Sequence, residues 1–118
     1  MRKKKADKTE KNVDEEHGIL TREDIVDACS YVLAKFDVKF AYIFGSYAKG
    51  NATPVSDVDL LVSTEVTGLR FFGLVEELRN ALRKKVDVLD MNQLRNNLQL
   101  TEEILNNGMK IYEQRIIN

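Results

Sequence analysis

The 118-residue sequence predicts a single α+β domain (an α/β sandwich), in which helices pack against a small mixed β-sheet. The length suits one domain, and the 43% of hydrophobic residues can supply one core. Segments with helical periodicity alternate with short runs rich in β-branched and aromatic residues. We expect the order helix, strand, strand, helix, strand, helix, with an added edge strand at Ile111 and Tyr112.

Residues 1–18 differ in composition from the rest of the chain. Their charges are basic first and acidic last, and Val13 is almost the only large apolar residue after Met1. Such a segment cannot bury enough apolar surface to offset its ordering entropy. We therefore interpret residues 1–18 as a charged flexible N-terminal arm and residues 19–118 as the folded domain.

Three segments have the features of helices. Thr21 is a typical N-cap, and the apolar residues that follow recur at helical spacing for about four turns. A second helix is expected after Thr67, and a third, short one should run from a cap at Thr101 to Gly108. The apolar face of the second helix is predicted to contain Phe71, Val75, Leu78 and Leu82. The aromatic residues expected in the core are Tyr31, Tyr42, Phe71 and Phe72.

Three short segments have the composition of strands. Residues 38–44 are rich in aromatic and β-branched side chains and stop at Gly45. Residues 58–62 and 86–89 follow as a second and a third strand. Asp90 is expected to cap a turn directly after the third strand.

Composition restricts the classes of function. The 18 basic and 19 acidic residues give a net charge of −1, which disfavours bulk binding of nucleic acid. No apolar run reaches the ~18–20 residues that cross a bilayer, so we expect no membrane association and a cytoplasmic protein. The single cysteine, Cys29, lies on the apolar stripe of the first helix and is predicted to be a buried, inert thiol. Glu76 and Glu77 accompany the basic residues of the second helix and its end, which indicates a solvated helix face: Arg79, Arg83, Lys84 and Lys85.

Three acidic residues form the candidate site. Side chains alternate along a strand, so Asp57 and Asp59 should point to one face. If the third strand lies beside the second, Asp87 joins them. Convergent carboxylates suit Mg²⁺ or Mn²⁺, and such sites serve phosphoryl displacement. Each acid alone could be an ordinary surface residue. Asp90 lies close to Asp87 in sequence, but strand parity places it on the opposite face.

A glycine-containing segment precedes these acids. Gly45 allows a turn at the strand end and a close approach to a ligand, Ser46 offers a hydroxyl and an amide, and Gly50 frees the exit. Free N–H groups at a helix start suit phosphate. Phosphate groups beside carboxylate-bound metal indicate a site for a nucleoside triphosphate.

The combined pattern resembles the polymerase-β-like nucleotidyltransferase superfamily. The matching motifs are Gly45-Ser46-x-Ala48-x-Gly50, then Ser56-Asp57-x-Asp59-Leu60, then Val86-Asp87-Val88. The resemblance covers about residues 20–113. The short chain looks like a minimal nucleotidyltransferase, the type found in prokaryotic two-gene pairs and toxin–antitoxin modules.

The resemblance implies roles for these residues. Asp57 and Asp59 would bind Mg²⁺, and Asp87 would complete the metal site and help to deprotonate the acceptor hydroxyl. That hydroxyl would attack the α-phosphate of a nucleoside triphosphate, ATP in our interpretation, and release pyrophosphate. Lys49 stands where many relatives carry arginine. The residues expected to bind the nucleotide are Gly45, Ser46, Lys49 and Ser56.

The resemblance also implies a partner, because relatives of this size are commonly paired with a helical HEPN-type protein. In some pairs the small domain transfers AMP to a tyrosine of the partner and silences its ribonuclease activity, which is the hypothesis we favour. In others the partner is thought to complete the substrate site. Two further readings are a non-catalytic antitoxin that acts by binding and a small-molecule transferase of the aminoglycoside type. The sequence leaves a homodimer open.

Overall fold

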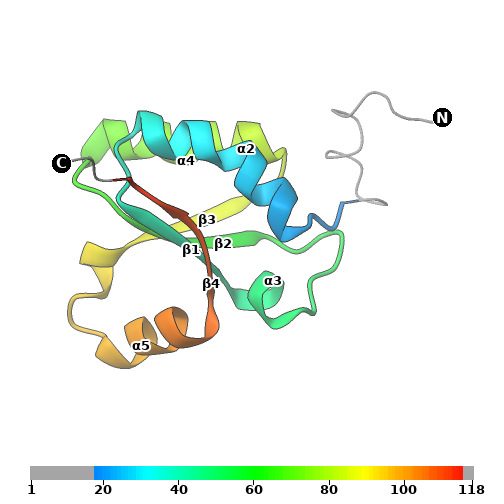
Figure 1. Ribbon diagram of the computed structural model, residues 1–118. Helices are drawn as coiled ribbons and strands as arrows, with labels where there is room; N and C mark the ends of the chain where they lie inside the picture. Colours follow the sequence, from blue (N-terminus) through cyan, green and yellow to red (C-terminus); the bar gives the residue numbers. More distant parts are fainter. Residues whose placement is uncertain (1–17, 116–118) are drawn as a thin grey trace.

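The computed structural model describes residues 18–115 and contains a four-stranded sheet with helices on both faces (Figure 1). The α+β fold and the element order predicted from the sequence are confirmed. The predicted arm lies outside the described residues except for Gly18, which is buried and accepts a hydrogen bond from the Tyr47 hydroxyl. The elements are α2 (Arg22–Lys35), β1 (Phe40–Phe44), α3 (Gly45–Lys49), β2 (Val58–Ser63), α4 (Gly68–Leu82), β3 (Val86–Asp90), the 3-10 helix η2 (Met91–Leu94), α5 (Leu98–Asn107) and β4 (Met109–Glu113).

The sheet is mixed, with the strand order β3-β2-β1-β4. Strand β1 pairs antiparallel with β2 and with β4. Strand β4 confirms the edge strand predicted at Ile111 and Tyr112. Strand β3 pairs parallel with β2, so that Asp59 lies directly opposite Asp87. Phe44, the last residue of β1, lies opposite Asp59. The C-terminal end of β1 and the start of β2 and β3 therefore meet at one edge of the sheet.

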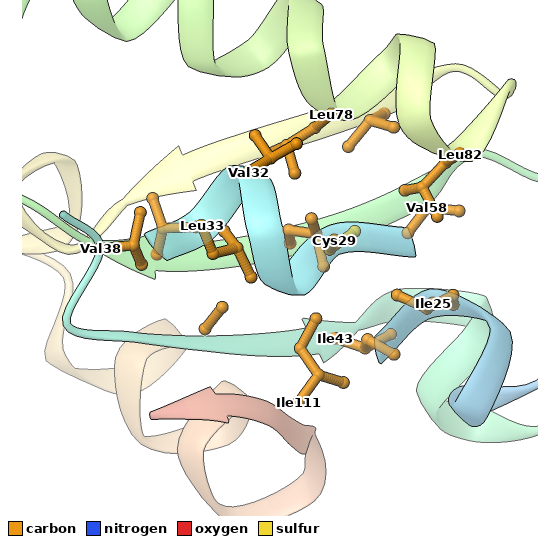
Figure 2. Packing of buried hydrophobic residues seen from close by; sticks show 14 of the residues in the cluster. Ile25, Cys29, Val32, Leu33, Val38, Ile43, Val58, Leu78, Leu82 and Ile111 are labelled. Atoms are coloured by element: carbon orange, nitrogen blue, oxygen red, sulfur yellow. The ribbon is translucent and has the colours of Figure 1, made fainter. Parts of the chain in front are cut away.

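Helices α2 and α4 lie side by side over one face of the sheet, and α5 lies on the other (Figure 1). The main core forms beneath α2 and α4, where Ile25, Cys29 and Leu33 pack against strand residues such as Ile43 and Val58 (Figure 2). A smaller cluster on the opposite face joins Leu61 to Leu94 and Ile104. This second cluster covers only part of its face, and the acidic pair lies beside it. No helix within residues 18–115 is long and apolar enough to span a bilayer.

Two predicted core aromatics are exposed. Tyr31 is 76% exposed and Phe72 is 61% exposed, so these two predictions are wrong. Each lies two residues from a core residue on its own helix, Cys29 and Leu74, which is a rotation of about 200° around the helix axis. Both side chains therefore point away from the sheet, and Leu74 takes the core position in α4.

Helix α5 begins four residues earlier than expected. The predicted cap at Thr101 is wrong, because the Asn97 side chain accepts from the backbone N–H of Leu100 at 3.1 Å and caps the helix start. Thr101 lies inside the first turn and its hydroxyl donates to the Asn97 carbonyl at 3.0 Å. A turn-forming Asn four residues before Thr101 competes for the same role, and the earlier cap adds one turn to the helix.

The predicted buried thiol is confirmed, since Cys29 is fully buried and burial raises its pKa to about 12. In the unfolded chain the thiol ionises near its ordinary pKa of about 8.5. Between these two values the unfolded state binds fewer protons than the folded state, so the free energy of unfolding falls as pH rises. We expect the stability advantage of the wild type over Cys29→Ala to shrink by about 2 kcal/mol from pH 8 to pH 10. Urea unfolding of both proteins at each pH measures this, and a pH-independent difference would contradict it.

Candidate active site

The centre of the site is the pair Asp59 and Asp87 on adjacent parallel strands. Directly paired residues of neighbouring strands project to the same face at a spacing of about 4.8 Å. Burial raises the pKa of the Asp59 carboxyl, and the negative charges of Asp87 and Asp57 raise it further. A hydrogen-bonding contact between the Asp59 and Asp87 carboxyl groups adds to this effect. Because two charged carboxylates at such a distance repel, the pair favours a proton or a cation between them.

Asp57 lies just before β2 and lines a hollow of about 310 Å³ beside this pair. Its charge contributes to the raised pKa of Asp59, so it lies within electrostatic range. Within residues 18–115, however, no three Asp, Glu, His or Cys side chains are gathered in the arrangement of a closed metal site. The structure therefore brings Asp59 and Asp87 together and places Asp57 near them without the full predicted convergence.

Asp90, the alternative third acid, lies elsewhere. It pairs with Val62 on β2, is only 8% exposed and points to the opposite face from Asp87. Its carboxylate accepts from the backbone N–H of Asn92 at 3.3 Å and caps η2, as the sequence predicted. Asp90 thus has a structural role, and strand parity correctly separates it from Asp87.

Gly45 joins β1 to α3 and lies against the acidic pair. Its backbone has φ +72°, a left-handed conformation that glycine adopts without strain. A Cβ at this position would overlap the Asp59 carboxylate oxygen Oδ2. Only glycine therefore allows the backbone at the start of α3 to approach this carboxylate.

Helix α3 is held by Tyr47 and ends at Lys49, with Gly50 as its C-cap. Tyr47 is buried, and its hydroxyl donates to the Gly18 carbonyl at 3.3 Å, so this residue anchors the helix. No side chain caps the start of α3, which leaves Ser46 and the first amides available at the edge of the site. Lys49 is exposed and lines a hollow of about 150 Å³ between α3 and α5.

Ser56, which the sequence analysis expects to bind nucleotide, shapes a turn in the structure. Its hydroxyl accepts from the backbone N–H of Thr53 at 2.8 Å and lies 3.3 Å from the Thr53 hydroxyl. This turn positions Asp57 at the rim of the hollow. Ser56 also lines that hollow, so a ligand there would contact it.

The sequence interpretation missed the opposite wall of this hollow, which consists of Arg83, Lys84 and Lys85. From the sequence, the nearby acids Glu76 and Glu77 indicated a solvated helix face for these basic residues. In the structure α4 ends at Leu82, and Arg83 adopts a left-handed conformation with φ +57°. After this reversal, the three residues line the same hollow as Asp57. A non-glycine residue in that conformation carries no clear sequence signal.

Comparisons with known proteins agree with this geometry. The family model described as polymerase beta, nucleotidyltransferase, matches residues 27–116. A Methanocaldococcus jannaschii protein named as a candidate protein adenylyltransferase is 39% identical over 83 residues, which cover 68% of this chain and 86% of the relative. A solved candidate minimal nucleotidyltransferase has a TM-score of 0.64 at 27% identity and covers 78% of this chain and 97% of its own.

A further solved structure contains a tri-AMPylated HEPN toxin of Shewanella oneidensis in complex with an MNT antitoxin. It has a TM-score of 0.59 at 18% identity and covers 80% of this chain and 74% of the matched chain, a likeness that concerns the fold. The family match extends over most of the sequence and includes all three acids and the Gly45 turn. The chain is a nucleotidyltransferase and belongs to the polymerase beta nucleotidyltransferase family.

Proposed function

We propose that this chain is a Mg²⁺-dependent protein adenylyltransferase that acts in the cytoplasm as the antitoxin of a toxin–antitoxin pair. It transfers AMP from ATP to the hydroxyl group of a tyrosine on a HEPN-type partner. The similar Methanocaldococcus jannaschii protein, named for protein adenylylation, supports the transferred group. The solved complex of an MNT antitoxin with an AMPylated HEPN toxin supports the class of partner.

One observation carries the proposal: the acidic pair Asp59 and Asp87 lies against the Gly45 turn at the edge of the sheet. Backbone amides at the start of α3 offer donors for phosphate oxygens on one side of the pair. The carboxylates offer ligands for a divalent cation in the same place. A site for a nucleoside triphosphate needs both kinds of group within one ligand's length.

The residues present fit a divalent cation. Hard carboxylate oxygens are the donors that Mg²⁺ and Mn²⁺ prefer. Burial and the neighbouring negative charges raise the pKa of Asp59, and a bound cation would offset this repulsion between the carboxylates. Asp59 and Asp87 would hold the ion, with Asp57 as the further ligand. When bound, Mg²⁺ would neutralise charge on the phosphate oxygens.

The chain's own residues then orient the reaction. Ser46 and the first amides of α3 bind and orient the triphosphate, with Lys49 at the end of the same helix. The acceptor oxygen forms a bond to the α-phosphorus as the bond from that phosphorus to the bridging oxygen breaks. Pyrophosphate leaves with the bonding electron pair. Asp87 is exposed, unlike the half-buried Asp59, and is therefore placed to accept the proton of the incoming hydroxyl.

The direct test is intact mass spectrometry of a co-expressed HEPN-type partner after incubation with ATP and Mg²⁺. We expect the partner to gain one or more AMP masses with the wild type and none with Asp57→Asn. Asp27→Asn, a change at an exposed acid on α2, is the matched control and should transfer normally. A stable complex with an unchanged partner mass would refute transfer and favour an antitoxin that acts by binding alone.

A second prediction separates charge repulsion from catalysis. Asp59→Asn removes a carboxylate that burial and its neighbours destabilise, so the Tm of the metal-free protein should rise by roughly 1–4 °C. Mg²⁺ should raise the Tm of the wild type and leave that of Asp59→Asn unchanged, because the variant loses a ligand. Differential scanning calorimetry with EDTA or Mg²⁺ measures both effects. An equal Mg²⁺ response in the two proteins would remove Asp59 from the metal site.

A third prediction concerns Gly45. Gly45→Ala introduces a left-handed alanine, which costs about 1 kcal/mol, and displaces the Asp59 carboxylate. Gly68→Ala is the control, because Gly68 has φ +59° but an added Cβ there meets nothing within 4 Å. Both variants should lose similar stability, whereas only Gly45→Ala should lose about 100-fold in transfer rate. Equal rates in the two variants would show that the close approach is not needed.

A further inference from the structure

The proposed reaction gives no role to the basic residues of the hollow beside Asp57. The hollow has a volume of about 310 Å³ and lies between the loop before β2 and the turn between α4 and β3. Its cationic wall is Arg83, Lys84 and Lys85, and its other wall includes Ser56 and Asp57. The backbone N–H of Val58 donates to the Lys85 carbonyl at 3.0 Å, which holds the two walls side by side.

The charges of this hollow are unbalanced. Three cations face one carboxylate, whereas the whole chain carries a net charge of −1. Lys84 is already engaged, since its Nζ donates to the Pro54 carbonyl at 2.7 Å and ties the turn to the loop. Within the described part of the chain, the side chains of Arg83 and Lys85 form no salt bridge. These two cations are available to an anionic ligand.

The sheet order determines which substrate reaches them. Strand β2, which carries Asp59, lies between β1 and β3. The Gly45 turn therefore flanks the acidic pair on the β1 side, and Lys85 flanks it on the β3 side. In an in-line displacement the attacking and leaving oxygens occupy opposite sides of the phosphorus. If pyrophosphate leaves on the Gly45 side, the acceptor hydroxyl arrives from the side of Lys85.

We propose that Arg83 and Lys85 form an acceptor-binding site, which holds an anionic group next to the acceptor hydroxyl on the partner protein. The inference rests on the proposed transfer reaction. The anion is a carboxylate of a neighbouring Asp or Glu, or the phosphodiester of an AMP that the partner already carries. Both offer oxygens to a guanidinium and an ammonium group. This site gives the domain specificity for its acceptor.

The test compares the double variant Arg83→Gln/Lys85→Gln with the wild type and with Lys39→Ala. Lys39 is an exposed cation just before β1, at the end of that strand opposite to Gly45. We expect the KM for the HEPN-type partner to rise about 10-fold in the double variant and to stay unchanged in Lys39→Ala. The Kd for a non-hydrolysable ATP analogue, measured by calorimetry, should stay within about two-fold of the wild type. As single variants, Lys85→Arg should keep most of the affinity for the partner that Lys85→Gln loses.

The outcomes are distinct. Weaker binding of the ATP analogue in the double variant would assign these cations to the triphosphate and overturn the inference, as would an unchanged KM for the partner. Absence of transfer by the wild type would instead refute the proposed function itself.

A partner protein that already carries one AMP, prepared with limiting ATP, distinguishes the two anions. If the double variant raises the KM for the first AMP transfer, the cations bind carboxylates of the partner. If it raises the KM only for the second transfer, they bind the phosphodiester of the first AMP.

Discussion

The parallel pairing of β2 with β3 is the constraint on which the site depends. The register places Val58 opposite Val86 and Asp59 opposite Asp87. A shift of one strand by a single residue would move its core side chains to the face of the site and its acidic side chain into the core. The two valines are fully buried beneath α2 and α4, which makes such a shift costly. Apolar packing on one face therefore holds two carboxylates together on the other. Mutual repulsion alone would drive these carboxylates apart.

The site is arranged at the expense of local stability. Burial and like charge raise the pKa of Asp59, and Gly45 adopts a backbone conformation that leaves no room for a side chain beside it. The charge repulsion around Asp59 is unfavourable in a protein that only needs to fold. Under the proposed function, a cation at this edge of the sheet would neutralise the carboxylates, and a triphosphate would accept hydrogen bonds from the amides of α3. The described fold supplies the surrounding core, with Tyr47 anchoring the helix that carries those amides.

The sequence predicts the positions of some residues correctly and those of others wrongly. Strand alternation correctly separates Asp87 from Asp90, since parity is a property of the backbone alone. Helical periodicity is weaker evidence for aromatic residues, because hydrophobic character suggested burial for Tyr31 and Phe72 although their positions on the helices point to solvent. The sequence did not predict that Arg83–Lys85 form the wall of a hollow, because one left-handed residue redirects the chain after α4. Arginine in that conformation has no characteristic sequence signal.

The sequence by itself determined the fold class, the order of the elements and the identity of the acids and of the Gly45 turn, because each follows from local periodicity, spacing or residue chemistry. Only the tertiary structure decided that β3 pairs with β2, that Asp57 stands apart from the closer pair, and that Ser56 serves a turn. These outcomes depend on contacts between residues distant in the chain. Such contacts are selected by how the whole core packs, and no local pattern records that choice.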